Sequence, residues 1–208
     1  MSSLPERAAR GGDWAARYWP VPILRALPAL AVGLAITFVA DQSPRVGLVA
    51  LGLFAVASAL ILGIATLRIV TERITRTVFL IHSIVSLVIG VLALALPGGT
   101  VGTLLFFLST LAAITGFLEL YAGLRNRPSA VSRDWITVGA FTAIAALVFL
   151  IIPSDTVLAV GMFGAFGILL GVYLVIAGLS LRWGPTTPEG IAPARAGDLA
   201  TETKAEAS

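Results

Sequence analysis

The stretch Val46–Leu67, VGLVALGLFAVASALILGIATL, decides the fold class, because its 22 residues contain no charged side chain. A helix of about 20 apolar residues is long enough to cross the roughly 30 Å hydrocarbon core of a bilayer. The apolar residues form a continuous run and do not alternate with polar ones, which indicates a helix and not a strand of a membrane barrel. We therefore expect a membrane-spanning helix here.

Five more apolar runs lie on the two sides of this stretch. The first of them is short and contains a proline. Together the six runs predict an all-α membrane protein with six transmembrane helices. The five runs are Ile23–Ala40, which contains Arg25 and Pro28, Thr77–Leu96, which contains His82, Val101–Leu124, which contains Glu119, and the uncharged Trp135–Ile152 and Thr156–Leu181.

The composition agrees with lipid as the solvent. Hydrophobic residues make up 58% of the chain, charged residues only 12%, and the mean hydropathy is +0.98. Soluble domains carry about 25% charged residues. These values exclude an ordinary water-soluble enzyme and a disordered chain. The net charge is +3, but the basic residues are too scattered for a phosphate-binding stripe, so the expected partner is the lipid bilayer and not a nucleic acid.

The basic residues predict how the helices are oriented. Thirteen of the fourteen Lys and Arg lie in the terminal segments, at the start of the first helix, or in the second and fourth connections, and only Arg45 lies on the other side. By the positive-inside rule, both termini are cytoplasmic. We expect a cytoplasmic tail over 1–20, a six-helix domain over 21–183 in a bacterial cytoplasmic (inner) membrane, and a disordered cytoplasmic tail over 184–208.

A pattern of small residues and prolines recurs with a period of about 56 residues. It predicts three parallel repeats, each a helix, a tight outer turn and a second helix, over about 21–68, 77–125 and 133–182. Small residues let helices approach closely in lipid, and proline stops a helix at the membrane surface. The predicted packing residues are Gly90, Gly116, Gly123, Gly164, Gly167, Gly171 and Gly178, and the predicted turn residues are Pro97 and Pro153.

The spacing Gly90-x6-Pro97, followed by Gly116-x6-Gly123-Leu124-Arg125, resembles the repeat unit of the HdeD-like acid-resistance membrane proteins. The third repeat is similar, and the resemblance covers roughly 21–183. The first repeat departs from it, with Ala40 in place of proline and Thr66 in place of glycine. The resemblance implies a six-helix bacterial inner-membrane protein linked to acid or envelope stress. It supplies no catalytic residues.

Three ionisable residues fall inside the predicted membrane boundary, where such groups are costly and often functional. His82 and Glu119 each lie six residues from a basic helix end, roughly 9 Å into the helix, and Arg25 occupies the position of His82 one repeat earlier. We expect Arg25, His82 and Glu119 to form an intramembrane polar cluster. Two interpretations stay open: these groups satisfy neighbours or snorkel to the interface, or a His–Glu pair responds to acidification.

The sequence offers no sign of a catalytic centre. One His and no Cys exclude a multi-His zinc site, and no oxyanion motif accompanies Ser83 and Ser86 beside His82. We expect a non-enzymatic protein without metal or cofactor that supports tolerance of acid or envelope stress. Two alternatives are a small transporter or channel with a polar pathway at Arg25, His82 and Glu119, and an assembly or chaperone partner acting through its glycine-rich faces on another membrane protein or as a homo-oligomer.

Overall fold

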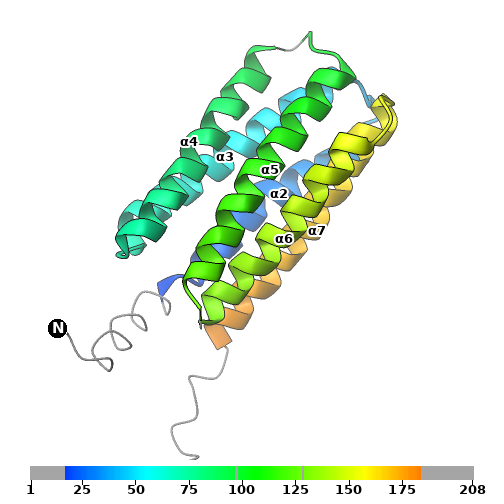
Figure 1. The fold of residues 1–208 in the computed structure, drawn as a ribbon. Helices are drawn as coiled ribbons and strands as arrows, with labels where there is room; N and C mark the ends of the chain where they lie inside the picture. Colours follow the sequence, from blue (N-terminus) through cyan, green and yellow to red (C-terminus); the bar gives the residue numbers. More distant parts are fainter. Residues whose placement is uncertain (1–16, 97, 128, 184–208) are drawn as a thin grey trace, which may run out of the picture.

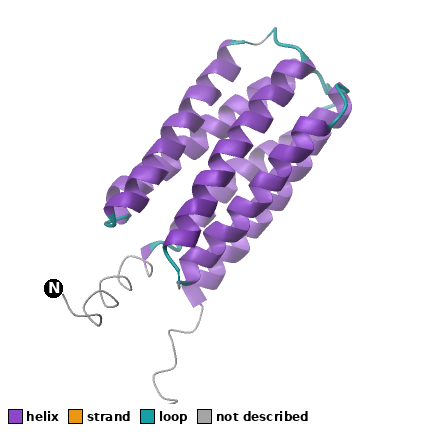
Figure 2. Ribbon diagram, in the orientation of Figure 1, coloured by secondary structure: helices purple, strands orange, loops and turns teal. Residues whose placement is uncertain are grey.

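The computed structural model describes residues 17–96, 98–127 and 129–183, which form a bundle of six long α-helices without a strand (Figures 1 and 2). Each helix is long and apolar enough to cross a membrane. The prediction of an all-α membrane protein with six spanning helices is therefore confirmed. The helices are α2 (Pro20–Phe38), α3 (Pro44–Ile69), α4 (Arg73–Ala95), α5 (Val101–Arg125), α6 (Ala130–Ile151) and α7 (Thr156–Trp183).

Several helices begin before their apolar runs do, because capping residues fix the starts. The side chains of Ser43, Glu72 and Ser129 each accept a hydrogen bond from the backbone N–H three residues later, which satisfies a free donor of the first turn. As a result α4 starts four residues before the predicted run, and α6 starts five residues before it. Hydropathy located the spans, and polar caps decided their bounds.

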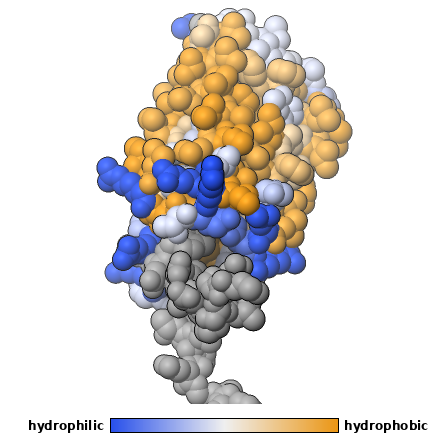
Figure 3. Space-filling view, turned by 60° about the vertical axis from the view of Figure 1, so that its left-hand side comes forward, coloured by the Kyte–Doolittle hydropathy of each residue, from blue (hydrophilic) through white to orange (hydrophobic). Residues whose placement is uncertain are grey.

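The two ends of the bundle differ in charge. Hydrophilic residues gather at one end, and a hydrophobic surface covers the length above it (Figure 3). We call this the basic end; α2 begins there and α7 ends there (Figure 1). The opposite end, with the short connections 39–43, 98–100 and 152–155, is called the turn end. The basic end carries Arg68, Arg73, Arg76, Arg125, Arg127, Arg133 and Arg182.

The closest packing joins helices of different predicted repeats. The most extensive contacts are between α5 and α6, α2 and α7, and α3 and α4. The two helices of each predicted hairpin, α2 with α3, α4 with α5 and α6 with α7, contact each other much less. The predicted hairpins are therefore units of sequence, while the packing units are the pairs across repeat boundaries.

Glycines lie at all three of these close interfaces. A methyl group added at Gly116 of α5 would lie 2.8 Å from the Ala143 nitrogen of α6, and one at Gly167 of α7 would lie 2.9 Å from the Ala29 oxygen of α2. These contacts are with backbone atoms, so only glycine permits this approach. The other predicted packing glycines lie at the same interfaces: Gly90 against α3, Gly123 against α6, and Gly164, Gly171 and Gly178 against α2.

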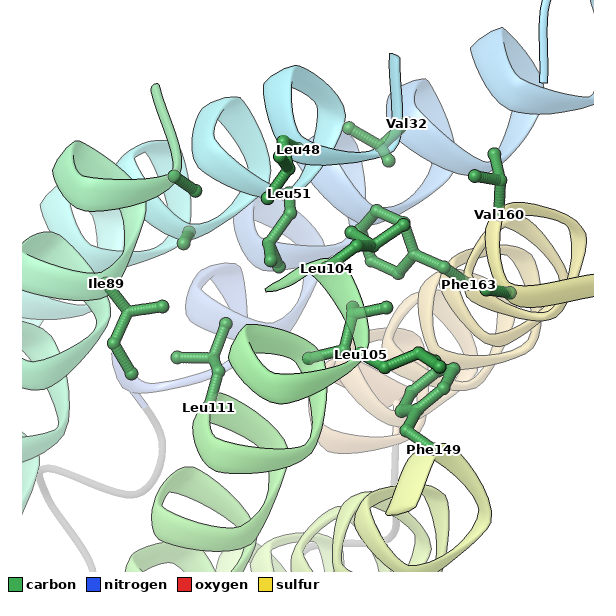
Figure 4. Packing of buried hydrophobic residues seen from close by; sticks show 14 of the residues in the cluster. Val32, Leu48, Leu51, Ile89, Leu104, Leu105, Leu111, Phe149, Val160 and Phe163 are labelled. Carbon is green, nitrogen blue, oxygen red and sulfur yellow. The ribbon is translucent and has the colours of Figure 1, made fainter. Parts of the chain in front are cut away.

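The core toward the turn end consists of apolar side chains contributed by all six helices. In Figure 4, Leu104 of α5 and Phe163 of α7 lie between the surrounding helices and point toward one another. Leu48, Leu51 and Val160 are fully buried in the same cluster. This half of the bundle interior is a packed hydrophobic core, and the buried ionisable groups lie nearer the basic end.

Candidate functional site

The structure brings Arg25, His82 and Glu119 together inside the bundle. Nη2 of Arg25 donates a hydrogen bond to Oε1 of Glu119 in an ion pair. Nδ1 of His82 lies 3.8 Å from the same carboxylate oxygen. Glu119 is 1% exposed and His82 is 4% exposed, so the cluster belongs to the interior and does not reach a helix end by snorkelling.

The repeat explains how three helices supply this cluster. Arg25 on α2 and His82 on α4 stand 57 residues apart at the same place in successive repeats. The remaining equivalent positions are occupied by buried apolar residues. Val138 on α6 corresponds to Arg25 and His82, and Leu62 on α3 and Leu174 on α7 correspond to Glu119. Of these six equivalent positions, only Arg25, His82 and Glu119 are ionisable.

The buried position of the cluster favours a net charge of zero. The charges of Arg25 and Glu119 cancel while His82 is neutral. In a low-dielectric interior, an uncompensated charge costs several kcal/mol. Two polar atoms of the cluster, Nδ1 of His82 and Oε2 of Glu119, are buried without a hydrogen-bond partner in the described part of the chain. Such groups in a native protein call for a water, an ion or a ligand.

A cavity of about 50 Å³ lies against the cluster. A site needs roughly 10–15 Å³ and several polar partners to hold a water molecule, so this cavity is large enough for water. Hydroxyl groups occupy repeat-equivalent positions on its wall, with Ser58 matched by Thr115 and Ser86 matched by Thr142. The cavity, which we call the polar cavity, therefore brings these hydroxyl groups and the ion pair together between otherwise apolar walls.

Aromatic side chains lie on both sides of this site. Phe54, Phe149, Phe163 and Phe166 line the cavity. One to two turns closer to the basic end, the rings of Tyr18 and Phe79 pack edge-on against Trp135, at centroid distances of 5.5 and 4.7 Å. Nε1 of Trp135 donates a hydrogen bond of 3.0 Å to the Tyr18 hydroxyl. These three rings are nearly fully buried and cover the cluster from the basic end.

Tyr18 should titrate at unusually high pH. Burial raises its pKa from 10.0 to about 12, against the lowering effects of the Arg25 charge and the Trp135 hydrogen bond. Because the folded state favours the neutral phenol, this stabilisation is complete below pH 10 and is lost as the pH rises through 12. We expect an absorbance titration at alkaline pH to show one phenol ionising near 12 that is missing in Tyr18→Phe. The associated loss of unfolding free energy is about 3 kcal/mol. Ionisation of that phenol near pH 10 would contradict this assignment.

Sequence reasoning missed the repeated hydroxyl groups on the cavity wall, the Tyr18–Trp135 contact, and Gly139 of α6, where a Cβ atom would lie 2.8 Å from the Gly116 oxygen of α5. Aligning the repeats would have revealed the hydroxyl pairs, since each pair occupies one position in successive copies. The contact between Tyr18 and Trp135 joins residues 117 apart and has no signal in a single sequence.

Of the predicted turn residues, Pro153 lies exposed after α6, and Pro97 is outside the described residues. Within the described ranges, no three His, Asp or Glu side chains are grouped to hold a metal ion.

Comparison with known protein families gives a match in the part of the chain that contains His82 and Glu119. No curated protein and no solved structure matches the chain. Residues 81–151 match the family model described as a short repeat of unknown function (DUF308). The matched segment runs from α4 to the end of α6 and includes the closely packed α5–α6 pair. The described part of the chain thus has the six apolar helices of a multi-pass membrane protein, and its residues 81–151 are similar to the DUF308 repeat.

Proposed function

We propose that this protein supports tolerance of acid or related envelope stress as a non-enzymatic protein of a bacterial cytoplasmic membrane. The basic end faces the cytoplasm in this proposal, because cytoplasmic loops carry the excess of Lys and Arg. The HdeD-like resemblance of the repeats and the DUF308 match over 81–151 support the proposal. The observation that carries it is the buried Arg25–Glu119 ion pair with His82 at 3.8 Å.

The charge of this cluster depends on proton concentration. Protonation of Glu119 removes the negative partner of Arg25, and protonation of His82 places a second positive charge near Arg25. Either event leaves an uncompensated charge in the interior, where it strongly destabilises the surrounding packing. Acidification therefore favours a rearrangement of the helices that hold the cluster. That rearrangement is the step by which the protein responds to acid.

The proposal predicts an acid phenotype that depends on two side chains. A deletion strain should survive exposure to low pH clearly less well than the parent. Plasmid copies with His82→Ala or Glu119→Gln should fail to restore survival, because each fixes the charge of one titrating group. Survival is measured by colony counts across pH, with the membrane content of each variant measured by immunoblot.

Asp155→Asn is the matched control for this experiment. It makes the same acid-to-amide change at an exposed position, where Asn also serves as a helix cap. This variant should restore survival fully. Full restoration by both His82→Ala and Glu119→Gln at normal protein levels would refute the role of the cluster.

A small transporter is the second candidate, and the polar cavity beside Glu119 is the observation that favours it. Flux of protons or solutes across proteoliposomes containing the purified protein tests this candidate. The assembly-partner alternative depended on glycine-rich faces available to another protein. All seven predicted packing glycines lie against helices of the same chain, so they give that alternative no support.

A further inference from the structure

A wide groove separates α2 from α3 on the outer surface of the bundle. Its volume is about 790 Å³, and its walls are largely apolar, with small side chains such as Ala31, Ala35 and Ala50. It extends from Asp41 and Arg45 at the turn end to the middle of the bundle. The groove exists because α2 packs tightly on α7 and α3 packs tightly on α4, leaving their shared interface loose.

One side chain connects this groove with the polar cavity. Phe54 lines both spaces, and its ring packs edge-on against Phe163 at a centroid distance of 6.2 Å. Pro28 of α2 lines the groove on the facing wall. Proline removes one backbone hydrogen bond from a helix, so α2 deforms more easily here than a regular helix would. Rotation of the Phe54 ring would open a path from the bilayer to the Arg25–Glu119 cluster.

The charges around Glu119 restrict what can occupy the cavity. Arg25 of α2, His82 of α4 and the nearby Tyr18 are the ionisable groups that face it. The other helices contribute hydroxyl and apolar side chains, among them Ser58 of α3, Thr142 of α6 and Leu174 of α7. Because the cluster is neutral in total, an ion entering alone would be uncompensated, which favours a neutral occupant. A route through lipid also selects neutral molecules.

The buried polar atoms without a hydrogen-bond partner indicate which chemical group could bind in the cavity. Oε2 of Glu119 is an acceptor that needs a donor, and the guanidinium of Arg25 beside it supplies donors to an acceptor. An undissociated carboxyl group offers one O–H donor and one carbonyl acceptor on the same carbon atom. The cavity has about one third of the roughly 150 Å³ that accommodates benzene, so it holds a head group and not a long tail.

We propose that the cavity binds the undissociated carboxyl group of a membrane-soluble monocarboxylic acid, which enters through the α2–α3 groove past Phe54 and leaves its apolar tail in the groove. The inference rests on the proposed function, since it names a ligand for the same cluster. The bound acid transfers its proton to Glu119: the O–H bond of the ligand breaks, an O–H bond forms on Glu119, and the ligand carboxylate replaces Glu119 as the partner of Arg25. The net charge of the site stays at zero.

The test is photolabelling of the full-length protein in nanodiscs of phosphatidylcholine, with a medium-chain carboxylic acid that carries its diazirine on the carbon next to the carboxyl group. At pH 5 we expect adducts on the cavity residues near the cluster, such as Ser58 and Leu111, and competition by hexanoic acid. Phe54→Trp should reduce these adducts about tenfold, because a larger ring obstructs the path. Phe54→Ala, which widens the path, should increase them. Phe117→Trp, at a 66% exposed lipid-facing position, should leave them unchanged.

The variant Glu119→Gln provides a second test in the same labelling experiment. The amide oxygen introduced by this variant still accepts a hydrogen bond from Arg25, unlike the side chain in Glu119→Leu, but it carries no charge, so Arg25 can bind the ligand as an anion. Labelling of the wild type should fall at least about tenfold between pH 5 and pH 7.5, whereas labelling of Glu119→Gln should persist at pH 7.5. Competition by hexan-1-ol equal to that by hexanoic acid would overturn the recognition of a carboxyl group. Adducts confined to the surroundings of Asp41 and Arg45 would overturn entry into the cavity.

The outcomes separate this inference from the proposed function. Absence of cavity adducts, together with an acid-survival defect of His82→Ala and Glu119→Gln, overturns the carboxylic acid site and leaves the role of the cluster in acid tolerance. Cavity adducts that follow the Phe54 variants, together with normal survival of the deletion strain, overturn the function and leave the binding site.

Discussion

Glu119→Leu is expected to abolish most of the folded protein, whereas the double variant Arg25→Val with Glu119→Leu is expected to recover it. The single change leaves the Arg25 guanidinium in the bundle interior without its partner. Breaking one side of a buried ion pair costs about 3–5 kcal/mol, and a typical domain has only about 5–15 kcal/mol of stability. Folded yield by size-exclusion chromatography and the Tm in detergent measure the effect.

The double variant should recover the folded yield because the equivalent positions in the other repeats already hold apolar residues. Leu62 and Leu174 are the buried counterparts of Glu119, and Val138 is the buried counterpart of Arg25. Replacing a complete buried pair by packed apolar groups is often neutral or stabilising by 1–4 kcal/mol. The recovered variant should nevertheless fail to restore acid survival, because it lacks the titrating carboxylate. That combination would separate the role of the pair in folding from its role in function.

Two results would contradict this account. Wild-type yield and Tm of Glu119→Leu would mean that Arg25 finds another partner or reaches water, and that the ion pair is unimportant for folding. A double variant as unstable as Glu119→Leu would mean that the pair itself holds α2 and α5 together. Arg45→Val, an exposed arginine at the turn end, is the control for loss of a positive charge and should change the Tm little.

Gly139→Ala is the second substitution with a large expected effect. A Cβ atom at this position of α6 would lie 2.5 Å from the Leu120 nitrogen and 2.8 Å from the Gly116 oxygen, both in α5. Backbone atoms cannot rotate away as a side chain can, so the two helices must separate along their interface. Overpacking of this kind costs about 3 kcal/mol. We expect a clear fall in Tm and in folded yield.

Gly161→Ala is the matched control, since a Cβ atom there would have no heavy atom within 4 Å in the described structure. Alanine is favoured over glycine in a helix by about 1 kcal/mol. The Tm of this variant should therefore equal or slightly exceed that of the wild type. Equal Tm values for Gly139→Ala and Gly161→Ala would show that the α5–α6 interface is looser than described, and the close-packing interpretation would fail.

The six helices could be predicted from the sequence, but the residues at which they begin could be predicted less accurately. The apolar run Val46–Leu67 lies within α3, which extends from Pro44 to Ile69. Hydropathy is a property of neighbouring residues, so it locates a span wherever the chain folds. A start set by a cap, such as Ser129 before α6, depends on single hydrogen bonds that hydropathy does not register.

The candidate site was predictable in its members and not in its arrangement. The cost of ionisable groups in lipid singled out Arg25, His82 and Glu119. Which of them pair depends on the rotation of each helix about its axis, and that rotation is set by contacts with other helices. The assignment of Arg25 as the direct partner of Glu119, with His82 beside it, required the tertiary structure.

By itself, the sequence determined that this protein has six apolar helices and that its basic residues gather at one end, because hydrophobicity and charge belong to each segment regardless of its neighbours. Only the tertiary structure decided that α3 packs on α4, α5 on α6 and α2 on α7. A glycine permits close approach on one face of a helix but does not specify which helix approaches. That choice depends on whether two surfaces fit together, as Gly116 and Gly139 do across α5 and α6.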